Sequence, residues 1–240
     1  MMLGFIFGPY WWMAIPPALL AMWAQYRLQS THAEFSQVAT DRGITGAEAA
    51  REILDRNGLT GVPIQEVPGE LTDHYDPTKR AVFLSEGTSR SISVSAVGVA
   101  AHEVGHALQH KDAYAMLGLR MALVPVTGIA STVSSLLILL GFFIGQMRGL
   151  YGFGNTLLML GIGFFSVVAL FQVITLPVEY DASARAKVQL QKLGLVTPRE
   201  YDGVDRVLSA AALTYVAAMF AALSQLLQLI LMSRSRDNDR

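Results

Sequence analysis

The chain is organised around residues 91–106, which read Ser-Ile-Ser-Val-Ser-Ala-Val-Gly-Val-Ala-Ala-His-Glu-Val-Gly-His. This stretch is small and apolar before its two histidines, which predicts a buried helix. In a helix His102 and His106 lie one turn apart on the same face, so both imidazoles can reach one metal ion. Glu103 lies about 100° further round and would flank that ion. Gly105 costs about 1 kcal/mol in a helix, so we expect a close neighbour there.

The spacing is that of the H-E-x-x-H motif, in which two histidines bind zinc and the glutamate acts as general base. The alternative is an ordinary helix with two histidines in its polar face, which would leave the glycine without a reason. The chain has no cysteine, so histidine and carboxylate side chains would have to hold the zinc ion, which we expect once per chain. A catalytic zinc site usually has three protein ligands and one open position, so one more ligand is needed.

Composition indicates a membrane protein. Of the 240 residues, 52% are hydrophobic and only 15% are charged, whereas soluble domains have about 25% charged residues. The missing charge is concentrated in long apolar runs, which favours a lipid bilayer as a partner. The formal net charge of −1 gives no support to a nucleic-acid partner.

Four runs are long enough to span a bilayer, which takes about 20 mainly apolar residues. They are residues 3–24, 121–145, 153–176 and 207–232. We expect Pro9, Pro16 and Pro17 to kink or divide the first run, and Pro177 to end the third. A short loop joins the second and third, so they form a helical hairpin, and small residues such as Gly161 permit close packing inside it. Alternatively, the fourth run lies partly along the membrane interface.

The predicted fold is therefore a mainly α membrane protein with about four transmembrane helices and a zincin-like α+β catalytic region. The expected segments are an N-terminal anchor (1–24), a polar zincin-like region (25–120), a transmembrane hairpin (121–176), a second polar region (177–206), a C-terminal span (207–232) and a polar tail (233–240). Gly194 should separate two helices in the second polar region.

Short elements are expected ahead of the H-E-x-x-H helix. Helices are predicted at 26–40 and at 45–57, the latter starting with a capping box at Thr45. A short strand pair should follow at 62–67 and 80–85, where β-forming residues cluster between turn signals.

Glu179 is the best candidate for the third zinc ligand. His110 continues the histidine series, but about 12 Å of helix rise separates it from His102, too far to share one tetrahedral ion. His32 and His74 have no supporting spacing. The predicted hairpin returns the chain to the side it left, and Glu179 lies just beyond that return. The alternative for Glu179 is an ordinary carboxylate at the start of a helix.

Four stretches together resemble the YugP-type family of bacterial membrane zinc metallopeptidases, which is similar to HtpX and the CAAX prenyl proteases. They are residues 102–110, 71–77, 176–183 and 211–217. The resemblance covers nearly the whole chain. It implies zinc bound by His102, His106 and Glu179, with Glu103 as the base.

The chain departs from the HtpX-like pattern at one position. In that pattern an aspartate follows the ligand glutamate by four residues, whereas here the position holds Ser183 and the nearby carboxylate is Asp181. A set of polar residues could orient the ligands or stabilise an oxyanion: Asp181, His74, Tyr75, Tyr180 and Arg185.

The expected reaction is peptide-bond hydrolysis. Zinc activates a water molecule, and Glu103 takes its proton and passes it to the leaving amine. Val82, Phe83 and Leu84 lie in the second predicted strand, which could bind an extended substrate by edge pairing. The alternative for this strand is an ordinary buried role.

These features predict an integral membrane zinc endopeptidase that acts on protein or peptide substrates in or near a bacterial cytoplasmic membrane. The two polar regions carry 14 Lys and Arg residues against four on the opposite side, which favours an active site facing the cytoplasm. Small-residue faces permit a homo-oligomer. Two alternatives remain: a non-catalytic membrane partner protein with a structural or vestigial metal site, and a zinc hydrolase of a non-peptide amide.

Overall fold

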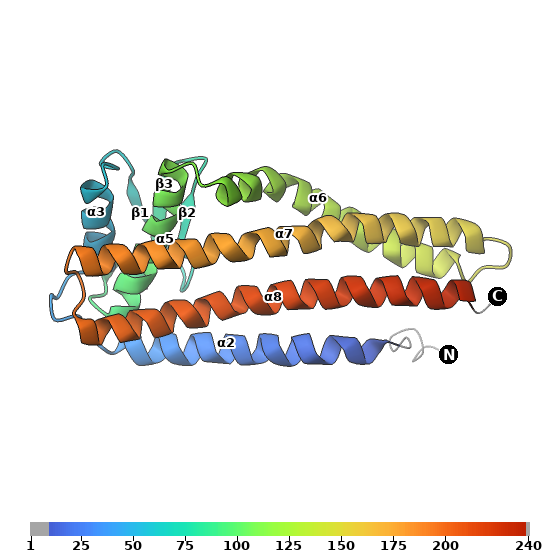
Figure 1. Ribbon diagram of the computed structural model, residues 1–240, viewed down its shortest axis with the longest axis horizontal. Helices are drawn as coiled ribbons and strands as arrows, with labels where there is room; N and C mark the ends of the chain where they lie inside the picture. Colours follow the sequence, from blue (N-terminus) through green and yellow to red (C-terminus); the bar gives the residue numbers. More distant parts are fainter. Residues whose placement is uncertain (1–9, 239–240) are drawn as a thin grey trace. The chain divides into compact units, whose positions relative to one another are not determined.

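The structure is a computed structural model that describes residues 10–238 (Figure 1). Most of the chain is helical. The elements, in chain order, are η1 (Trp11–Ala14), α2 (Ile15–Ser36), α3 (Gly46–Arg56), β1 (Ile64–Val67), β2 (His74–Asp76), β3 (Ala81–Ser85), α4 (Glu86–Arg90), α5 (Val94–Lys111), α6 (Ala115–Ile144), α7 (Tyr151–Lys192) and α8 (Pro198–Asn238).

The described chain divides into two compact units. One unit consists of the residues up to Trp23, Leu119–Leu176 and the residues from Tyr215 onward. The other consists of Ala24–Gly118 and Pro177–Thr214, and it contains the sheet, α5 and the second part of α7. The residues predicted to bind zinc all lie in this second unit.

A three-stranded sheet stands in place of the predicted strand pair. Its order is β1-β3-β2, with β1 parallel and β2 antiparallel to the central strand. All five residues of β3 are buried, as expected of a strand with a neighbour on each side. The sequence prediction missed β2 because a strand of three residues carries almost no periodic signal.

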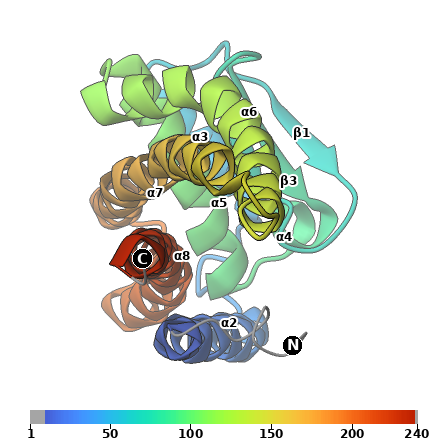
Figure 2. The same ribbon diagram turned by 90° about the vertical axis from the view of Figure 1, so that its right-hand side faces the viewer.

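The core of this unit forms where α3 and α5 pack with β3. Fully buried apolar side chains meet there, among them Ile53, Leu54, Val82, Leu84 and Val97. The predicted capping box at the start of α3 is confirmed, since the Thr45 hydroxyl accepts from the Glu48 N–H and the Glu48 carboxylate accepts from the Thr45 N–H. Figure 2 shows the strands to one side of α5.

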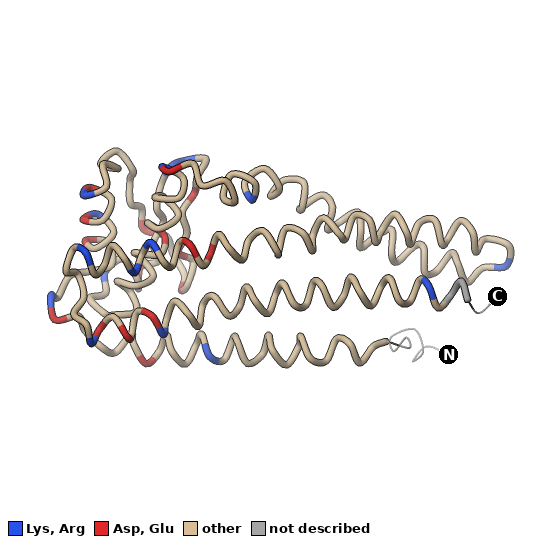
Figure 3. Tube along the Cα trace, viewed as in Figure 1, with Lys and Arg blue, Asp and Glu red and all other residues tan. Residues whose placement is uncertain are grey.

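Three helices in the described residues are long and apolar enough to cross a membrane: Ala115–Ile144, Tyr151–Lys192 and Pro198–Ser235. They correspond to the second, third and fourth predicted spans, and long parts of them carry no charged side chain (Figure 3). The first predicted span is not confirmed. Its residues 3–9 lie outside the described part of the chain, and α2 is not among the three candidate helices. α2 also continues to Ser36, so the separate helix predicted at 26–40 does not exist.

Two predictions about helix ends have different outcomes. Pro177 does not end a helix as expected, because α7 continues through it to Lys192. A proline inside a helix removes one backbone hydrogen bond, a loss that buried packing can offset. The predicted break at Gly194 is confirmed, since this glycine has a φ of 59° between α7 and α8.

In the unit that contains Leu119–Leu176, α6 and α7 approach closely. A Cβ at Gly161 would lie 3.0 Å from the Ile138 nitrogen, and the Ser134 hydroxyl donates to the Gly161 carbonyl at 2.9 Å. Small residues therefore let the two helix backbones pack together, as predicted for this hairpin.

Candidate metal centre

Three potential metal ligands converge from two helices. His102 and His106 lie on α5, and Glu179 lies on α7. The Glu179 Oε2 atom is 3.3 Å from His102 Nε2 and 3.5 Å from His106 Nε2. All three side chains offer ligand atoms within 4.8 Å of one another, and no other such group occurs among the described residues.

The donor set fits a zinc ion. Zinc binds histidine nitrogen and carboxylate oxygen at about 2.0–2.1 Å in tetrahedral geometry, which places neighbouring ligand atoms about 3.3–3.5 Å apart. The two distances from Glu179 to the histidines agree with that spacing. Glu179 is 1% exposed, and a buried carboxylate needs a positive partner or hydrogen-bond donors. Histidine nitrogens and a carboxylate without cysteine also match the zinc sites of peptidases.

Gly105 allows the two helices to come together. A Cβ at this position would lie 3.0 Å from the carbonyl carbon of Ala182 on α7 and 3.1 Å from its Cα, and closer still to its oxygen. Any side chain larger than hydrogen would therefore collide with the backbone of α7. The close neighbour predicted from the sequence exists, and it belongs to the helix that carries Glu179.

Gln109 determines which nitrogen of His106 is free. Its Nε2 donates to the Val178 carbonyl at 2.7 Å and to Asp181 Oδ2 at 2.8 Å. These two acceptors orient the amide, so its Oε1 faces His106 Nδ1 at 3.0 Å and must accept a hydrogen from it. The Nε2 lone pair of His106 is then free for a metal ion, on the side where Glu179 lies.

Further side chains hold Gln109 and His102 in their orientations. Asp181 accepts from Arg185 Nε at 2.6 Å, and Arg185 also pairs with Asp112 at the end of α5. His102 is oriented separately, because its Nδ1 lies 3.1 Å from the Ser183 hydroxyl. Ser183 therefore contacts one histidine directly, while Asp181 acts on the other through an intervening amide.

Glu103 is buried beside the three ligands. It is 8% exposed, and this burial raises the pKa of its carboxyl to about 7, with smaller opposing and reinforcing effects from His102 and Glu179. The backbone N–H of Tyr75 in β2 faces the carboxylate and slightly opposes this rise in its pKa. Glu103 is thus held between α5 and the edge of the sheet.

β1 and β2 are the two edge strands of the sheet, and β2 is the one beside Glu103. In β3 the Val82 N–H donates to the Pro63 carbonyl on the β1 side, so the N–H groups of Ala81 and Phe83 face β2. Tyr75 lies opposite Val82, so its backbone N–H and carbonyl face away from β3.

Because β3 has a neighbour on each side, the prediction that it binds substrate by edge pairing is wrong. Its residues Val82, Phe83 and Leu84 are buried, and they fill the sheet instead.

The other predicted polar residues contact groups other than the three ligands. His74 is exposed and stacks on Phe83, with ring centroids 4.7 Å apart, and Tyr180 is 51% exposed. His110 is not a member of the metal-binding group, as its spacing predicted, and its Nδ1 meets the Tyr75 hydroxyl at 2.8 Å. His32 instead pairs with Ser95.

The sequence prediction missed two residues that shape the site. Gln109 lies three residues after His106, on the same helix face, and that spacing could have identified it. Asp73 accepts from the Ser85 N–H and hydroxyl and from the Thr88 hydroxyl, which fixes the start of β2. No local pattern relates these residues, because they meet only in the folded sheet.

Comparison with known proteins identifies the class. Residues 10–234 match the model of a family described as "Putative neutral zinc metallopeptidase", so the chain belongs to that family. A curated relative in Bacillus subtilis (strain 168), named "Putative membrane protease YugP", is 49% identical over 212 residues, which are 88% of this chain and 91% of that protein. No solved structure matches.

Proposed function

We propose that the protein is a membrane-embedded zinc endopeptidase that hydrolyses peptide bonds of membrane or membrane-near proteins. The observation that carries the proposal is the convergence of His102, His106 and Glu179, with the buried Glu103 beside them. Three protein ligands are the number that a catalytic zinc site uses, since the fourth position must stay open. Membership of a zinc metallopeptidase family supports the same reading.

Each residue has a chemical task in this proposal. His102, His106 and Glu179 would hold the zinc ion, whose Lewis acidity makes water nucleophilic near neutral pH and polarises a carbonyl group. Glu103 accepts the proton of the attacking water and delivers it to the leaving nitrogen. A carboxyl whose pKa is raised toward neutrality suits both steps, because it can bind and release a proton at working pH.

The oxyanion requires a further donor. Arg185 is paired with Asp181 and Asp112, and the Tyr75 hydroxyl meets His110, so both have other partners. His74 stacks on Phe83 and its Nδ1 meets the Thr72 carbonyl, whereas Tyr180 is 51% exposed and follows Glu179 directly, which makes Tyr180 the better candidate.

We assign substrate binding to the edge of β2. The outward-facing carbonyl of Tyr75 can accept a hydrogen bond from an extended peptide, and the Tyr75 N–H on the same edge faces Glu103. A peptide added to this edge would therefore pass directly over the proposed base. This moves the predicted edge-pairing role from β3 to β2.

The proposed location is a bacterial cytoplasmic membrane with the site facing the cytoplasm. Three helices can cross a bilayer, and the related Bacillus protein is named a membrane protease. The excess of Lys and Arg in the polar regions supports the orientation.

The test is proteolysis by the detergent-purified protein. Wild type and Glu103→Gln are incubated with casein, and new peptide ends are mapped by mass spectrometry. We expect internal cleavage by wild type only, with equal zinc content in both proteins. Zinc without hydrolysis of casein or of a membrane-protein extract would favour a structural metal site, whereas release of a fatty acid from a lipid amide would favour a non-peptide substrate.

A further inference from the structure

A second feature of the same unit is a pocket at the far end of α5 from its N-terminus. Its volume is about 480 Å³, which lies within the usual range for ligand pockets. Its polar lining side chains are those of Tyr75, Arg80, His110 and Lys111, and no Asp or Glu lines it.

The polar groups of this pocket can all donate hydrogen bonds. Arg80 and Lys111 carry only donors in their side chains, and both are exposed. The His110 Nδ1 meets the Tyr75 hydroxyl, so Nε2 is the ring nitrogen left to face the pocket. When the hydroxyl donates to Nδ1, Nε2 carries the hydrogen and becomes a third donor. Such a set is complementary to a carboxylate.

No ion pair of the described residues includes Arg80 or Lys111, although Lys111 also lines a neighbouring pocket with Asp112 and Asp181. Lys111 Nζ donates to a backbone carbonyl, that of Asn57, at 2.7 Å. Asp76, the acidic residue nearest in sequence to Arg80, accepts from Thr78 and from the Lys79 N–H. The pocket therefore keeps a positive charge that a ligand can compensate.

Tyr75 connects the pocket to the proposed base. Its side chain lines the pocket, while its backbone N–H faces Glu103. A peptide paired with the outer edge of β2 would thus have the scissile bond near Glu103 and a neighbouring side chain within reach of the pocket. Arg80 approaches from the turn between β2 and β3, where it has the unusual φ of 50°.

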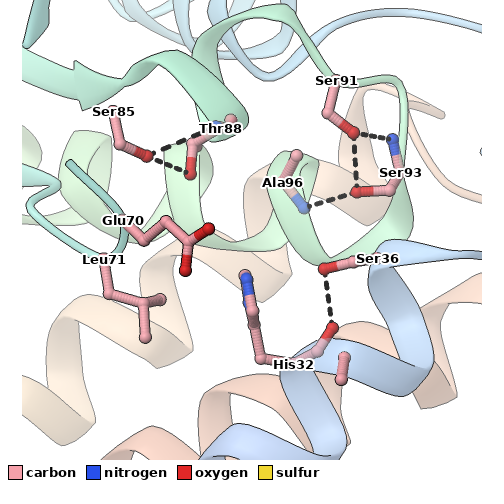
Figure 4. A pocket seen from close by; sticks show the side chains of 11 residues that line it. His32, Ser36, Glu70, Leu71, Ser85, Thr88, Ser91, Ser93 and Ala96 are labelled. Carbon is pink, nitrogen blue, oxygen red and sulfur yellow. Dashed lines mark hydrogen bonds between the residues drawn. The ribbon is translucent and has the colours of Figure 1, made fainter. Parts of the chain in front are cut away.

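A differently composed pocket lies beside the start of α5. It has a volume of about 410 Å³, and serine and threonine hydroxyls face His32 and Glu70 across it (Figure 4). Ser93 and Ala96 of this pocket precede the H-E-x-x-H motif along α5, whereas Ala107 and His110 of the cationic pocket follow it. The two pockets therefore differ in charge on the two sides of the proposed base.

We propose that the cationic pocket binds an acidic side chain of the peptide substrate, on one side of the scissile bond. The inference rests on the proposed function. It assigns Arg80, Lys111 and His110 as residues that determine specificity, and it restricts the acid preference to a single substrate position.

The test uses matched peptides that contain either glutamate or glutamine at one position, scanned along one fixed casein-derived sequence. Binding to full-length zinc-loaded Glu103→Gln protein in detergent is measured by fluorescence anisotropy. We expect glutamate to bind about tenfold more tightly than glutamine at one position and equally at the others. Arg80→Ala combined with Lys111→Ala should abolish this difference, so that the glutamate and glutamine peptides bind with equal affinity.

Two further variants distinguish binding inside the pocket from a general effect of surface charge. Lys79→Ala removes the same charge from the neighbouring position of the turn, outside the pocket lining, and should retain the preference. Arg80→Glu should reverse it in favour of a lysine peptide. Equal binding of the glutamate and glutamine peptides at every position, or no binding, overturns the inference. Charge-dependent binding with no hydrolysis of any peptide by wild type would instead overturn the proposed function and leave the pocket assigned.

Discussion

Gly105→Ala tests how closely α5 must approach α7. The added Cβ would lie 3.0 and 3.1 Å from two backbone carbons of Ala182, whereas ordinary contact begins at 3.4 Å. The contact with the Ala182 oxygen is tighter still, so the helices must separate by a distance on the order of 1 Å. Both distances from Glu179 to the histidines run between these helices and would lengthen together.

Gly105→Ala should lower the stability of the protein, whereas a glycine-to-alanine substitution inside a helix normally raises it. Alanine is favoured over glycine by about 1 kcal/mol inside a helix, but overpacking against a backbone costs about 1–3 kcal/mol. We therefore expect reduced stability, weaker zinc binding and about a hundredfold loss of peptidase activity, since a displacement near 1 Å has that effect on catalysis. The assays are thermal unfolding in detergent, zinc content after dialysis, and peptide cleavage.

Gly98→Ala is the matched control in the same helix. A Cβ there would meet only the Val204 side chain, at 3.4 Å or more, so the helix preference for alanine should dominate and stability should rise or stay level. If Gly105→Ala also raises stability and retains zinc, the close approach of the two helices is refuted.

Three further substitutions test the surroundings of the ligands. Gln109→Leu removes the acceptor for the His106 N–H and should weaken zinc affinity about 10- to 100-fold in a chelator competition, whereas an unchanged affinity would show that the amide does not orient His106. Ser183→Ala should weaken zinc binding less, because a hydroxyl is a weaker partner than the oriented amide, and a loss as large as that of Gln109→Leu would contradict this order. Glu103→Gln should raise the unfolding temperature of the metal-free protein at neutral pH, because burial disfavours the charged carboxylate, and a lower temperature would contradict that cause.

The parts of the site that depend on local spacing could be predicted from the sequence. The helix period places His102 and His106 together, and the helix cost of Gly105 already indicated a close neighbour. Glu179 was reached from the order of the apolar runs, because a hairpin returns the chain to the side it left. The chain direction and the geometry of a helix suffice for these predictions.

Features that depend on tertiary packing could not be predicted in the same way. β2 has three residues, too few for an alternating pattern, yet it forms one edge of the sheet and faces Glu103. The sequence of β3 is more apolar than that of β2 because β3 is the central strand of the sheet. Pro177 was expected to end the third apolar helix, but α7 continues through it. Helix propensity alone does not reveal the packing that retains a proline inside a helix.

The most direct test of the central claim is the zinc content of wild type and Glu179→Gln after equilibration with a weak chelator. Glu200→Gln, which changes another buried carboxylate, serves as the control. We expect about one zinc ion per chain in wild type and control, and at least a tenfold weaker affinity in Glu179→Gln. Full zinc retention by Glu179→Gln, with equal affinity, would contradict the assignment of the third ligand and with it the proposed centre.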